Sequence, residues 1–427
     1  MNLELGLVHR QVRETARRFA QNEAAPVARQ YDEEGRFAGD LVGRMGELGF
    51  LGGPIPRPYG GAGLDYLVLV VTLEEVARAD AGLASAITVH VGLNSLTLLQ
   101  WGTEEQKRRF LPPQATGEKL ACFGLTEPNA GTDVAATETI AVREGNGYRL
   151  NGTKTWITLA GVAEHLLIFA TLDRGQRHRG LCAFIVERGC AGLSTEVIRG
   201  KMGFRLANEA TVYLEDCVVP AENRLGEEGE GFAIAMSALD VGRLCSAAMA
   251  VGTAQACLDA SIAYARQRET FGRPIGRRQL VQQMIANMVV GVEAARLLTY
   301  KAAAARNRGE PATREASLAK WFASDVAVQA ALDAIQVHGA QGYASAFPVE
   351  RHLRNAKAAQ IYEGTNQVQQ IMQAEFALGY RGVQPLRCMP PAPESVAGGS
   401  EVGFDVPSGD RSVRPSSAGC PRGLNMG

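Results

Sequence analysis

The sequence lacks an excess of either charge, because 44 Lys and Arg residues face 45 Asp and Glu residues and the formal net charge is −1. It has no block of basic residues longer than pairs such as Arg17-Arg18 or Arg108-Arg109. Proteins that bind nucleic acids or anionic membranes normally carry a basic excess on at least one segment. The sequence therefore predicts no nucleic-acid partner.

Long hydrophobic runs and a secretion signal are also missing at first sight. We find no apolar stretch of the roughly eighteen residues that a membrane-spanning helix needs. The first twenty residues are charged and amphipathic, which is not typical of a signal peptide. We therefore expect no membrane span and a cytoplasmic location.

The eight cysteines form no CxxC pair, and no histidine stands at a spacing typical of zinc ligands. They occur at positions 122, 182, 190, 217, 245, 257, 388 and 420. Free cysteines behave as small apolar residues and are usually buried. We expect buried thiols and no metal site.

Several nucleotide-binding and hydrolytic motifs are absent. The chain lacks GxGxxG after a strand, GxxxxGK[ST], HExxH and GxSxG, which removes the usual support for a Rossmann dehydrogenase, a P-loop enzyme, a zincin or an α/β-hydrolase. Ser317-Leu-Ala-Lys320 fits the SxxK pattern of serine acyl-enzymes, but SDN and KTG do not accompany it. Because it lies in a regular helical stretch, we expect a structural role for it.

The hydrophobic period changes twice along the chain and predicts an α+β fold. Residues 1–119 have helical spacing and form an N-terminal helical domain. Residues 120–230 contain short runs of branched and aromatic residues, which predict a middle β-domain. Residues 231–382 return to helical spacing and predict a C-terminal four-helix bundle. Residues 383–427 hold seven of the eighteen prolines with many Gly and Ser residues, and we expect a disordered tail.

Local signals add detail to this division. Asn146-Gly147 is a hairpin turn signal, and Thr103 can cap a helix that carries acidic residues in its first turn. Strands are expected over residues 120–125, 139–143, 148–150, 165–172, 181–186 and 209–214.

Two segments of the β-domain contain polar and aromatic groups that a plain sheet does not need and that could contact a ligand. The loop CFGLTEPNAGTD at 122–133 gathers backbone N–H groups and the hydroxyls of Thr126 and Thr132. The strand NGTKTWIT at 151–158 places Trp156 beside threonines, so that an indole could face a flat ring. Taken alone, the first segment is more often an ordinary turn, and Trp156 is more often a core tryptophan.

Two segments of the helical bundle have similar potential. In RQRETFGRP at 266–274, Arg268 could pair with a phosphate and Phe271 could cover an adenine, or the segment is a charged helix end. In AQIYEGTNQV at 359–368, Glu363 precedes a helix-breaking glycine, and Thr365 can cap the next helix. A carboxylate at such a junction can project into a cleft, although most glutamates lie on the surface.

Together these segments resemble the acyl-CoA dehydrogenase family. The similarity is carried by LTEPNAGTD, NGTKTWIT, ARQRETFGRPI, IQVHGAQGY and QIYEGTNQVQ, and it covers about residues 3–380. The sequence of these motifs is most similar to that of short-chain or branched short-chain members. The order of helices, β-domain and bundle is also that of the family, so the resemblance and the hydrophobic pattern agree.

The resemblance implies an FAD enzyme without a Rossmann fold, assembled as a homotetramer built from two dimers. One group of residues would contact the isoalloxazine ring and its neighbouring chain: Phe123, Leu125, Thr126, Gly131, Thr132, Trp156, Ile157 and Thr158. A second group would grip the pyrophosphate and adenine of a neighbouring subunit: Arg268, Thr270, Phe271, Gln279, Gln336, Gly339, Ala340, Thr365 and Gln367. The family often has two glycines where this chain has Gly339-Ala340, which adds a methyl group near the cofactor.

By the same resemblance, Glu363 is the base that removes the α-proton of an acyl-CoA thioester, while a hydride passes from the β-carbon to flavin N5. The product is the trans-2-enoyl thioester, as in fatty acid β-oxidation. Some branches of the family place the base where this chain has Gly242, which cannot take a proton. The thioester and its pantetheine would contact Thr132, Asp240, Gly242, Arg243, Tyr362 and Gly364.

The sequence leaves other functions open. The same fold could serve an acyl-CoA oxidase, a desaturase acting on a carrier-protein thioester, or a silent protein that only binds flavin and acyl-CoA. An electron-transferring flavoprotein is the acceptor that the resemblance implies. The acyl group depends on side chains around residues 89–99, where a packing role is expected for His90.

Overall fold

The computed structural model describes residues 5–382, in which helices precede and follow a sheet. This arrangement confirms the predicted α+β fold class. The described residues form one compact unit, so the limits of the predicted domains at 1–119, 120–230 and 231–382 stay predictions. The predicted tail at 383–427 lies outside the described residues.

Within residues 5–382, seven α-helices precede the sheet. Two π-helical segments connect pairs of them: Ala20–Ala24 joins α1 to α2, and Thr88–Ser95 joins α5 to α6. The helices are α1 (Leu7–Phe19), α2 (Ala25–Glu34), α3 (Gly39–Glu47), α4 (Tyr66–Ala79), α5 (Ala81–Ile87), α6 (Leu96–Trp101) and α7 (Glu104–Ala115). The predicted cap of α7 is present, because the Thr103 hydroxyl accepts from the Gln106 N–H while the Gln106 side chain accepts from the Thr103 N–H.

Eight strands form the sheet in the order β6-β7-β3-β2-β4-β5-β8, and β1 pairs with β4 beside that path. The strands are β1 (Ala121–Gly124), β2 (Ile140–Glu144), β3 (Gly147–Thr158), β4 (His165–Thr171), β5 (Leu181–Glu187), β6 (Leu193–Val197), β7 (Glu209–Pro220) and β8 (Arg224–Leu225). All pairings are antiparallel except β1 with β4 and β2 with β4.

The hairpin between β2 and β3 was predicted one residue too late. Glu144 pairs with Gly147, so the two-residue loop is Gly145-Asn146 and Gly147 already belongs to β3. Gly145 takes the positive φ of 54° that the first loop position requires, which glycine adopts without steric cost.

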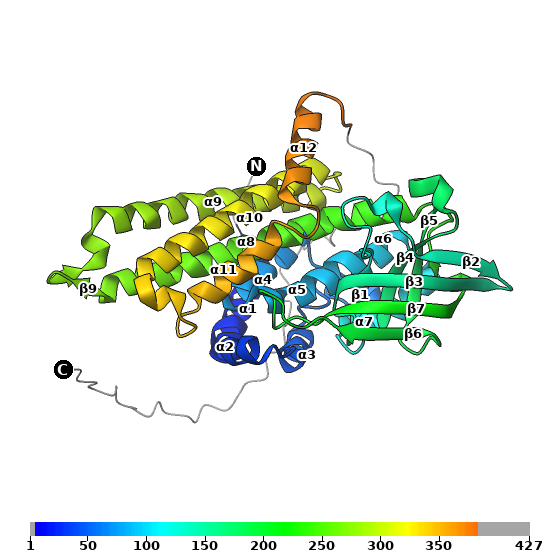
Figure 1. Cartoon of the computed structure of the whole chain (residues 1–427), viewed down its shortest axis with the longest axis horizontal. Helices are drawn as coiled ribbons and strands as arrows, with labels where there is room; N and C mark the ends of the chain where they lie inside the picture. The colour runs from blue at the N-terminus through cyan, green and yellow to red at the C-terminus, as the bar shows by residue number, and fades with distance from the viewer. Residues whose placement is uncertain (1–4, 383–427) are drawn as a thin grey trace. The chain divides into compact units, whose positions relative to one another are not determined.

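Up to residue 382, five α-helices follow the sheet: α8 (Gly231–Gln267), α9 (Gln279–Asn307), α10 (Thr313–His338), α11 (Val349–Ala359) and α12 (Asn366–Ala377). Figure 1 shows α8, α9 and α10 running side by side, and each of the three contacts the other two. The first four helices are the predicted bundle, and α12 is a short addition after the break at Gly364.

Two stretches are long and apolar enough to cross a membrane by length and composition, contrary to our expectation. They are Ala81–Trp101, which comprises α5, a π-helical segment and α6, and the whole of α8. The most apolar windows of these stretches are 100% and 89% buried inside the protein. Their apolar character is therefore explained by core packing.

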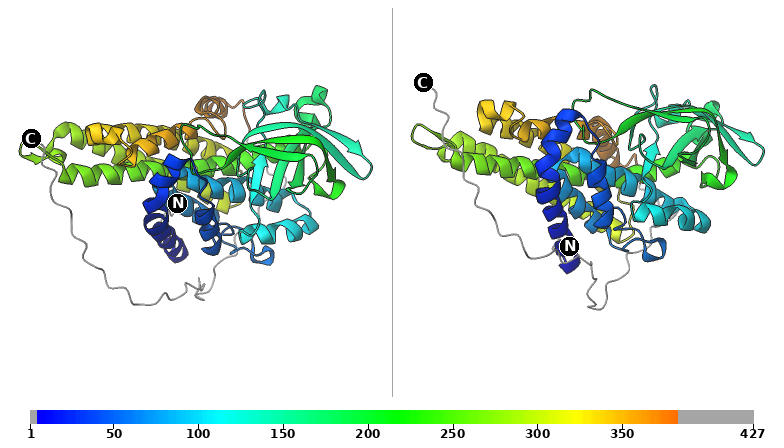
Figure 2. Two further views of the ribbon diagram at one scale, coloured as in Figure 1. Left: turned by 60° about the horizontal axis from the view of Figure 1, so that its bottom comes forward. Right: turned by 90° about the horizontal axis from the view of Figure 1, so that it is seen from below.

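The two ends of α8 lie in different surroundings. At its start, a Cβ on Gly231 would collide with the backbone of Leu181 and Cys182 in β5. At its end, α8 leads into the small hairpin of β9 (Glu269–Thr270) and β10 (Arg273–Pro274). The two further views in Figure 2 also place the large sheet at one end of α8 and this hairpin at the other.

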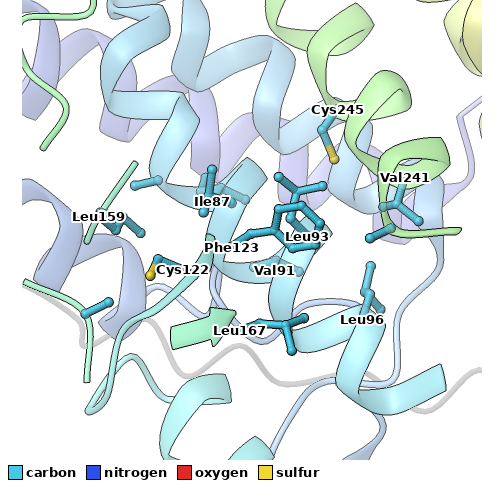
Figure 3. Packing of buried hydrophobic residues seen from close by; sticks show 14 of the residues in the cluster. Ile87, Val91, Leu93, Leu96, Cys122, Phe123, Leu159, Leu167, Val241 and Cys245 are labelled. Carbon is cyan, nitrogen blue, oxygen red and sulfur yellow. The ribbon is translucent and has the colours of Figure 1, made fainter. Parts of the chain in front are cut away.

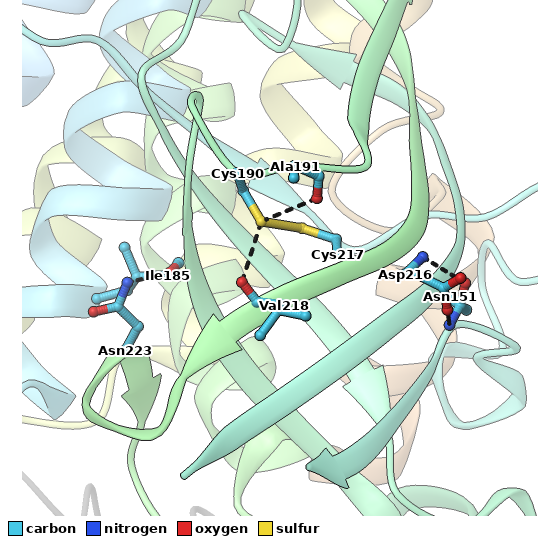
Figure 4. The surroundings of a disulfide bond; sticks show 8 residues. All are labelled: Asn151, Ile185, Cys190, Ala191, Asp216, Cys217, Val218 and Asn223. Carbon is cyan, nitrogen blue, oxygen red and sulfur yellow. Dashed lines mark hydrogen bonds between the residues drawn. A yellow bond between two sulfur atoms is a disulfide. The ribbon is translucent and has the colours of Figure 1, made fainter. Parts of the chain in front are cut away.

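The prediction of buried free thiols is correct for four cysteines and wrong for two. Cys122, Cys182, Cys245 and Cys257 are buried and unpaired. Cys190 and Cys217 instead form a disulfide between the β5–β6 connection and β7 (Figure 4). Their positions on neighbouring segments of the sheet could not be read from isolated cysteines in the sequence. Cys388 and Cys420 lie outside the described residues.

Candidate active site

Glu363 lies in the turn between α11 and α12 and has a left-handed backbone. Its φ is 60°, and the following Gly364 has a φ of 86°. A non-glycine residue in this conformation costs about 1–2 kcal/mol, so its surroundings must hold it there. Thr365 ends the turn as predicted, because its hydroxyl accepts from the Val368 N–H and caps α12.

Three side chains hold the carbonyls of this turn. The Gln369 side-chain amide donates to the backbone carbonyl oxygen of Glu363 at 3.1 Å and to that of Gly364 at 3.0 Å. Lys320 Nζ donates to the Gly364 oxygen at 2.8 Å, and Arg243 Nε donates to the Glu363 oxygen at 3.4 Å. The Glu363 N–H makes no hydrogen bond among residues 5–382. The turn therefore keeps one backbone donor free beside the carboxyl group.

The Glu363 carboxyl points into the protein against α8. A Cβ at Gly242 would lie only 1.7 Å from its Oε2 atom and 2.7 Å from a methyl group of Leu93. Oε2 is buried and has no hydrogen-bond partner in the described part of the chain. The bare face of Gly242 thus provides the space that the carboxyl occupies.

Burial raises the pKa of Glu363 to about 7, although Arg243 and Lys320 act in the opposite direction. A carboxyl group in apolar surroundings resists ionisation because its charged form loses hydration. A base works best when its pKa lies near the working pH. The environment of Glu363 is therefore suited to accepting a proton near neutrality.

Apolar side chains from three elements pack together near Gly242. Figure 3 shows Leu93 of the π-helical segment and Phe123 of β1 close to Val241 and Cys245 of α8. A Cβ on Gly92 would come within 3.0 Å of the Cys245 sulfur, so the π-helical segment and α8 are in tight contact here.

Asp240 and Arg243 form a buried ion pair one turn apart on α8. Arg243 Nη1 lies 2.7 Å from Asp240 Oδ1, and the Thr313 hydroxyl donates to Asp240 Oδ2. Arg243 is thereby fixed between Asp240 and the Glu363 carbonyl. Tyr362 packs edge-on against Phe204, with ring centroids 5.7 Å apart. The predicted substrate residues Asp240, Gly242, Arg243, Tyr362 and Gly364 thus lie around one point.

The two predicted flavin segments of the β-domain are joined by a buried ion pair. Lys154 Nζ lies 2.6 Å from Glu127 Oε1 and donates to the Leu125 carbonyl at 3.2 Å. The Thr155 N–H also donates to the Thr126 carbonyl at 2.9 Å. Both charged residues lie inside the quoted motifs, but their pairing was not predicted. Charged residues are rarely buried, so the sequence alone gives no reason to expect a buried ion pair here.

This pair of segments leaves groups available to a flat, polar ligand. The Thr126 and Thr132 hydroxyls make no hydrogen bond among residues 5–382. Trp156 has a φ of 59° at an irregular point of β3, and it is 58% exposed. Phe123, Leu125 and Ile157 are buried, and Gly131 lies in the exposed part of the loop. Unused hydroxyls beside an exposed indole fit the isoalloxazine end of FAD.

The second predicted flavin group lies at the far end of α8. Arg268, Thr270 and Phe271 belong to the β9–β10 hairpin region, and Gln279 begins α9. Gln336, Gly339 and Ala340 lie near the same end of α8. Tyr264 of α8 stacks on His338 at the end of α10, with ring centroids 4.3 Å apart.

From Gly242 to Gln267 the helical rise amounts to about 38 Å, so the hairpin group and the Glu363 turn are separate within one chain. Phe271 is 96% exposed. By contrast, Thr365 and Gln367 lie beside Glu363.

His90 has a structural role, as expected. Its Nδ1 accepts from the Ala121 N–H at 2.9 Å, and its Nε2 lies 2.9 Å from the Gln114 carbonyl. Burial lowers the pKa of His90 to about 4, so the ring is neutral near pH 7. A neutral histidine with both nitrogens engaged links the π-helical segment to β1.

Three profiles of known families match the chain, and all describe acyl-CoA dehydrogenases. The N-terminal domain matches residues 8–118, the middle domain 122–217 and the C-terminal domain 229–378. The chain belongs to the acyl-CoA dehydrogenase family. It is therefore an FAD-dependent oxidoreductase that acts on a CH–CH bond.

Relatives and solved structures give the same result. The short-chain specific acyl-CoA dehydrogenase of Clostridium acetobutylicum is 42% identical over 361 residues, which are 84% of this chain and 95% of the relative. The structure of butyryl-CoA dehydrogenase from Megasphaera elsdenii has a TM-score of 0.87 and 40% identity, covering 88% of this chain and 100% of that one. A prolyl acyl carrier protein oxidase reaches a TM-score of 0.85 at 37% identity, covering 88% and 100%.

Proposed function

We propose that this enzyme converts a short acyl-CoA into the trans-2-enoyl-CoA, with Glu363 as the base that takes the α-proton. The observation that carries the proposal is the Glu363 carboxyl itself. Its Oε2 atom is buried without a hydrogen-bond partner in the described residues, it faces the bare surface of Gly242, and burial raises its pKa to about 7. A structural carboxyl would have been paired.

Removing a proton next to a thioester carbonyl requires stabilisation of the charge that develops on the carbonyl oxygen. The free N–H of Glu363 is a suitable donor, because the left-handed turn presents it on the same residue as the base. One such donor contributes on the order of 3 kcal/mol to the stability of the transition state. Arg243, fixed by Asp240, donates to the carbonyl of the same residue and so helps to hold the turn.

FAD, when bound, supplies the acceptor for the hydride that leaves the β-carbon. We assign its ring end to Phe123, Leu125, Thr126, Gly131, Thr132, Trp156, Ile157 and Thr158, with Thr365 and Gln367 nearby. The Lys154–Glu127 pair holds the two segments together, so that the indole and the free hydroxyls stay in place. Thr132 would also contact the thioester.

We assign a short acyl group to the space beside the carboxyl. Leu93, Val241 and Cys245 lie close together next to it, and Gly92 brings the π-helical segment against α8 (Figure 3). The short-chain and butyryl-CoA relatives support this assignment.

We propose a homotetramer in which Arg268, Thr270, Phe271, Gln279, Gln336, Gly339 and Ala340 grip the flavin of another subunit. This group lies about 38 Å along α8 from Glu363, and most of its members are exposed. Exposed apolar side chains on α9, namely Leu280, Val289, Val290 and Leu297, suit contact with a second copy. An electron-transferring flavoprotein as acceptor and a cytoplasmic location stay predictions.

A carrier-protein oxidase is the second candidate, because a prolyl acyl carrier protein oxidase shares the fold at 37% identity. The two functions differ in what reoxidises the flavin and in what carries the acyl group. If oxygen restored the flavin colour faster than an electron-transferring flavoprotein did, or if only a carrier-bound acyl group were used, the second candidate would be favoured.

The test is anaerobic mixing of the purified holoenzyme with butyryl-CoA, followed by the flavin absorbance. The parent should bleach, and longer or branched thioesters should react more slowly. Glu363→Gln should bind FAD normally but bleach about a hundredfold to ten-thousandfold more slowly. Bleaching at the parent rate by Glu363→Gln would show that another group removes the proton.

A further inference from the structure

A buried lysine on α10 is the strongest feature that the proposed reaction does not yet use. Lys320 is completely buried, although a lysine ammonium is costly to remove from water. It belongs to the SxxK pattern, but its partner in that pattern, Ser317, is buried with no hydrogen bond in the described part of the chain. Lys320 and Ser317 therefore do not form the hydrogen-bonded pair that the motif would suggest.

Lys320 instead reaches the turn that carries Glu363. Nζ donates to the Gly364 carbonyl at 2.8 Å and to Asn366 Oδ1 at 3.0 Å. Asn366 is held in turn by Ser324 at 2.9 Å and by Asp325 at 2.8 Å. One face of α10 thus fixes both the second residue of the turn and the first residue of α12.

We propose that Lys320 is a positioning residue for the base, which anchors the left-handed Glu363-Gly364 turn and supplies a positive charge beside the carboxylate. The proposal rests on the proposed function, because it gives Lys320 its role through Glu363. Two consequences follow from the geometry. Loss of the ammonium should loosen the turn, and it should also make ionisation of the Glu363 carboxyl harder.

The second consequence depends on every charge near this pair. Glu363 faces Arg243 from α8 and Lys320 from α10, and both cations favour its ionised form. Lys320 in turn faces Glu363, Arg243 and Asp325. Burial lowers the pKa of Lys320 to about 7, so part of its charge is retained at neutral pH. Removing one of two nearby cations should therefore raise the pKa of Glu363.

A pH profile of anaerobic flavin bleaching by butyryl-CoA tests this in the holoenzyme. In Lys320→Met we expect the midpoint of the rising limb to move up by about one pH unit, and the plateau rate at high pH to fall by at least about tenfold. The KM for butyryl-CoA should change little, since Lys320 does not touch the substrate. Gln369→Leu, which removes only a neutral donor to the same turn, should lower the plateau rate and leave the midpoint unchanged.

Arg296→Met is the control for loss of a partly buried cation. Arg296 lies 2.7 Å from Glu74 and has no contact with the Glu363 turn. It should lower the melting temperature without moving the midpoint. Lys320→Gln is a second neutral variant, which should also move the midpoint upward.

The proposal is overturned if Lys320→Met or Lys320→Gln keeps the parent midpoint. It is also overturned if both fail to fold while Arg296→Met folds, because Lys320 would then be a structural residue. These outcomes are separate from failure of the proposed function. If Glu363→Gln is inactive but the Lys320 variants behave as the parent, the base assignment stands and only the role of Lys320 fails.

Discussion

Glu363 combines a left-handed backbone with a buried carboxyl oxygen that has no partner, and both features are unfavourable in the folded state. Such features persist when the surrounding structure holds them, and they occur preferentially at functional sites. Lys320, Gln369 and Arg243 provide this support through the two carbonyls of the turn. The unfavourable conformation and burial of Glu363 are thus consistent with a catalytic role for this residue.

The raised pKa of Glu363 also predicts a change in stability with pH. Its pKa is about 7 in the folded protein and near 4.5 in an unfolded chain. The parent should therefore lose stability as the pH rises from about 5 through 7, because the carboxyl must ionise while buried. Glu363→Gln does not titrate, and it should become more stable than the parent by about 1–3 kcal/mol above pH 8.

Thermal melts of parent and Glu363→Gln between pH 5 and pH 9 check this expectation. The difference in melting temperature should be small at pH 5, grow through pH 7 and then level off. A difference that is the same at all pH values would mean that the carboxyl has an ordinary pKa.

Sequence reasoning found Glu363 at the residue scale but not its surroundings. The motif around residues 359–368 was sufficient to single out the glutamate. Lys320 and Gln369 were not selected, because their value depends on which way the side chains point from α10 and α12. The SxxK pattern that contains Lys320 was predicted to be structural, and the sequence did not indicate that Lys320 is buried and bonded to the turn of Glu363.

At the scale of the elements, the surface of α8 limits how closely the Glu363 turn can pack against this helix. Gly242 removes the side chain that would otherwise block the carboxyl, and the sequence indicated only that a glycine cannot be a base. The steric role could not be read from the sequence, since Gly242 and Glu363 meet only after α10 and α11 have folded back along α8. This contact joins parts of the chain that are 121 positions apart.

A methyl group at this position should therefore disturb the base. In Gly242→Ala the Cβ would lie 1.7 Å from Glu363 Oε2, and the carboxyl must move. We expect flavin bleaching to slow by about a hundredfold, because a displacement near 1 Å can cost that much. FAD content should remain at the parent value.

Gly43→Ala in α3 is the matched control, since a Cβ there meets no atom within 4 Å. It should retain the parent rate and gain a few tenths of a kcal/mol in stability from the better helix propensity of alanine. An unchanged rate in Gly242→Ala would argue that the carboxyl does not work from this place.

Strands illustrate where periodic patterns were sufficient and where they were not. The buried strands β4 and β5 were predicted within about a residue, because they are apolar along their whole length. β6 was missed, since its LSTEV sequence is mostly exposed at the edge of the sheet and has no strong alternation. Edge strands depend on pairing with a neighbour, which a local pattern does not contain.

On the scale of the whole molecule, the two groups of predicted flavin residues are far apart along α8, apart from Thr365 and Gln367, which lie beside Glu363. The order of helices, sheet and helices was predictable, because the hydrophobic period changes from 3.6 to 2 and back. The distance between the two groups was not predictable, since it follows from the uninterrupted 37 residues of α8. Assembly of several copies would bring the groups together around each flavin.

This account predicts that oligomer and cofactor are lost together. Leu297→Glu on α9 places a charge where we expect contact with another copy. Light scattering should show a smaller species than for the parent, and the flavin content should fall.

Lys301→Glu is the control, because it also changes a charge on α9 but replaces an exposed lysine. It should keep both size and flavin content. Full flavin retention by a monomeric Leu297→Glu protein would exclude a shared flavin site.

The most direct test of the central claim is the rate of flavin bleaching with ordinary and C2-dideuterated butyryl-CoA between pH 5.5 and pH 9. If Glu363 in its ionised form removes the α-proton, the rate should rise with pH around a midpoint near 7, and deuterium should slow it at every pH. A rate that is independent of pH, together with no difference between the two substrates, would contradict the account.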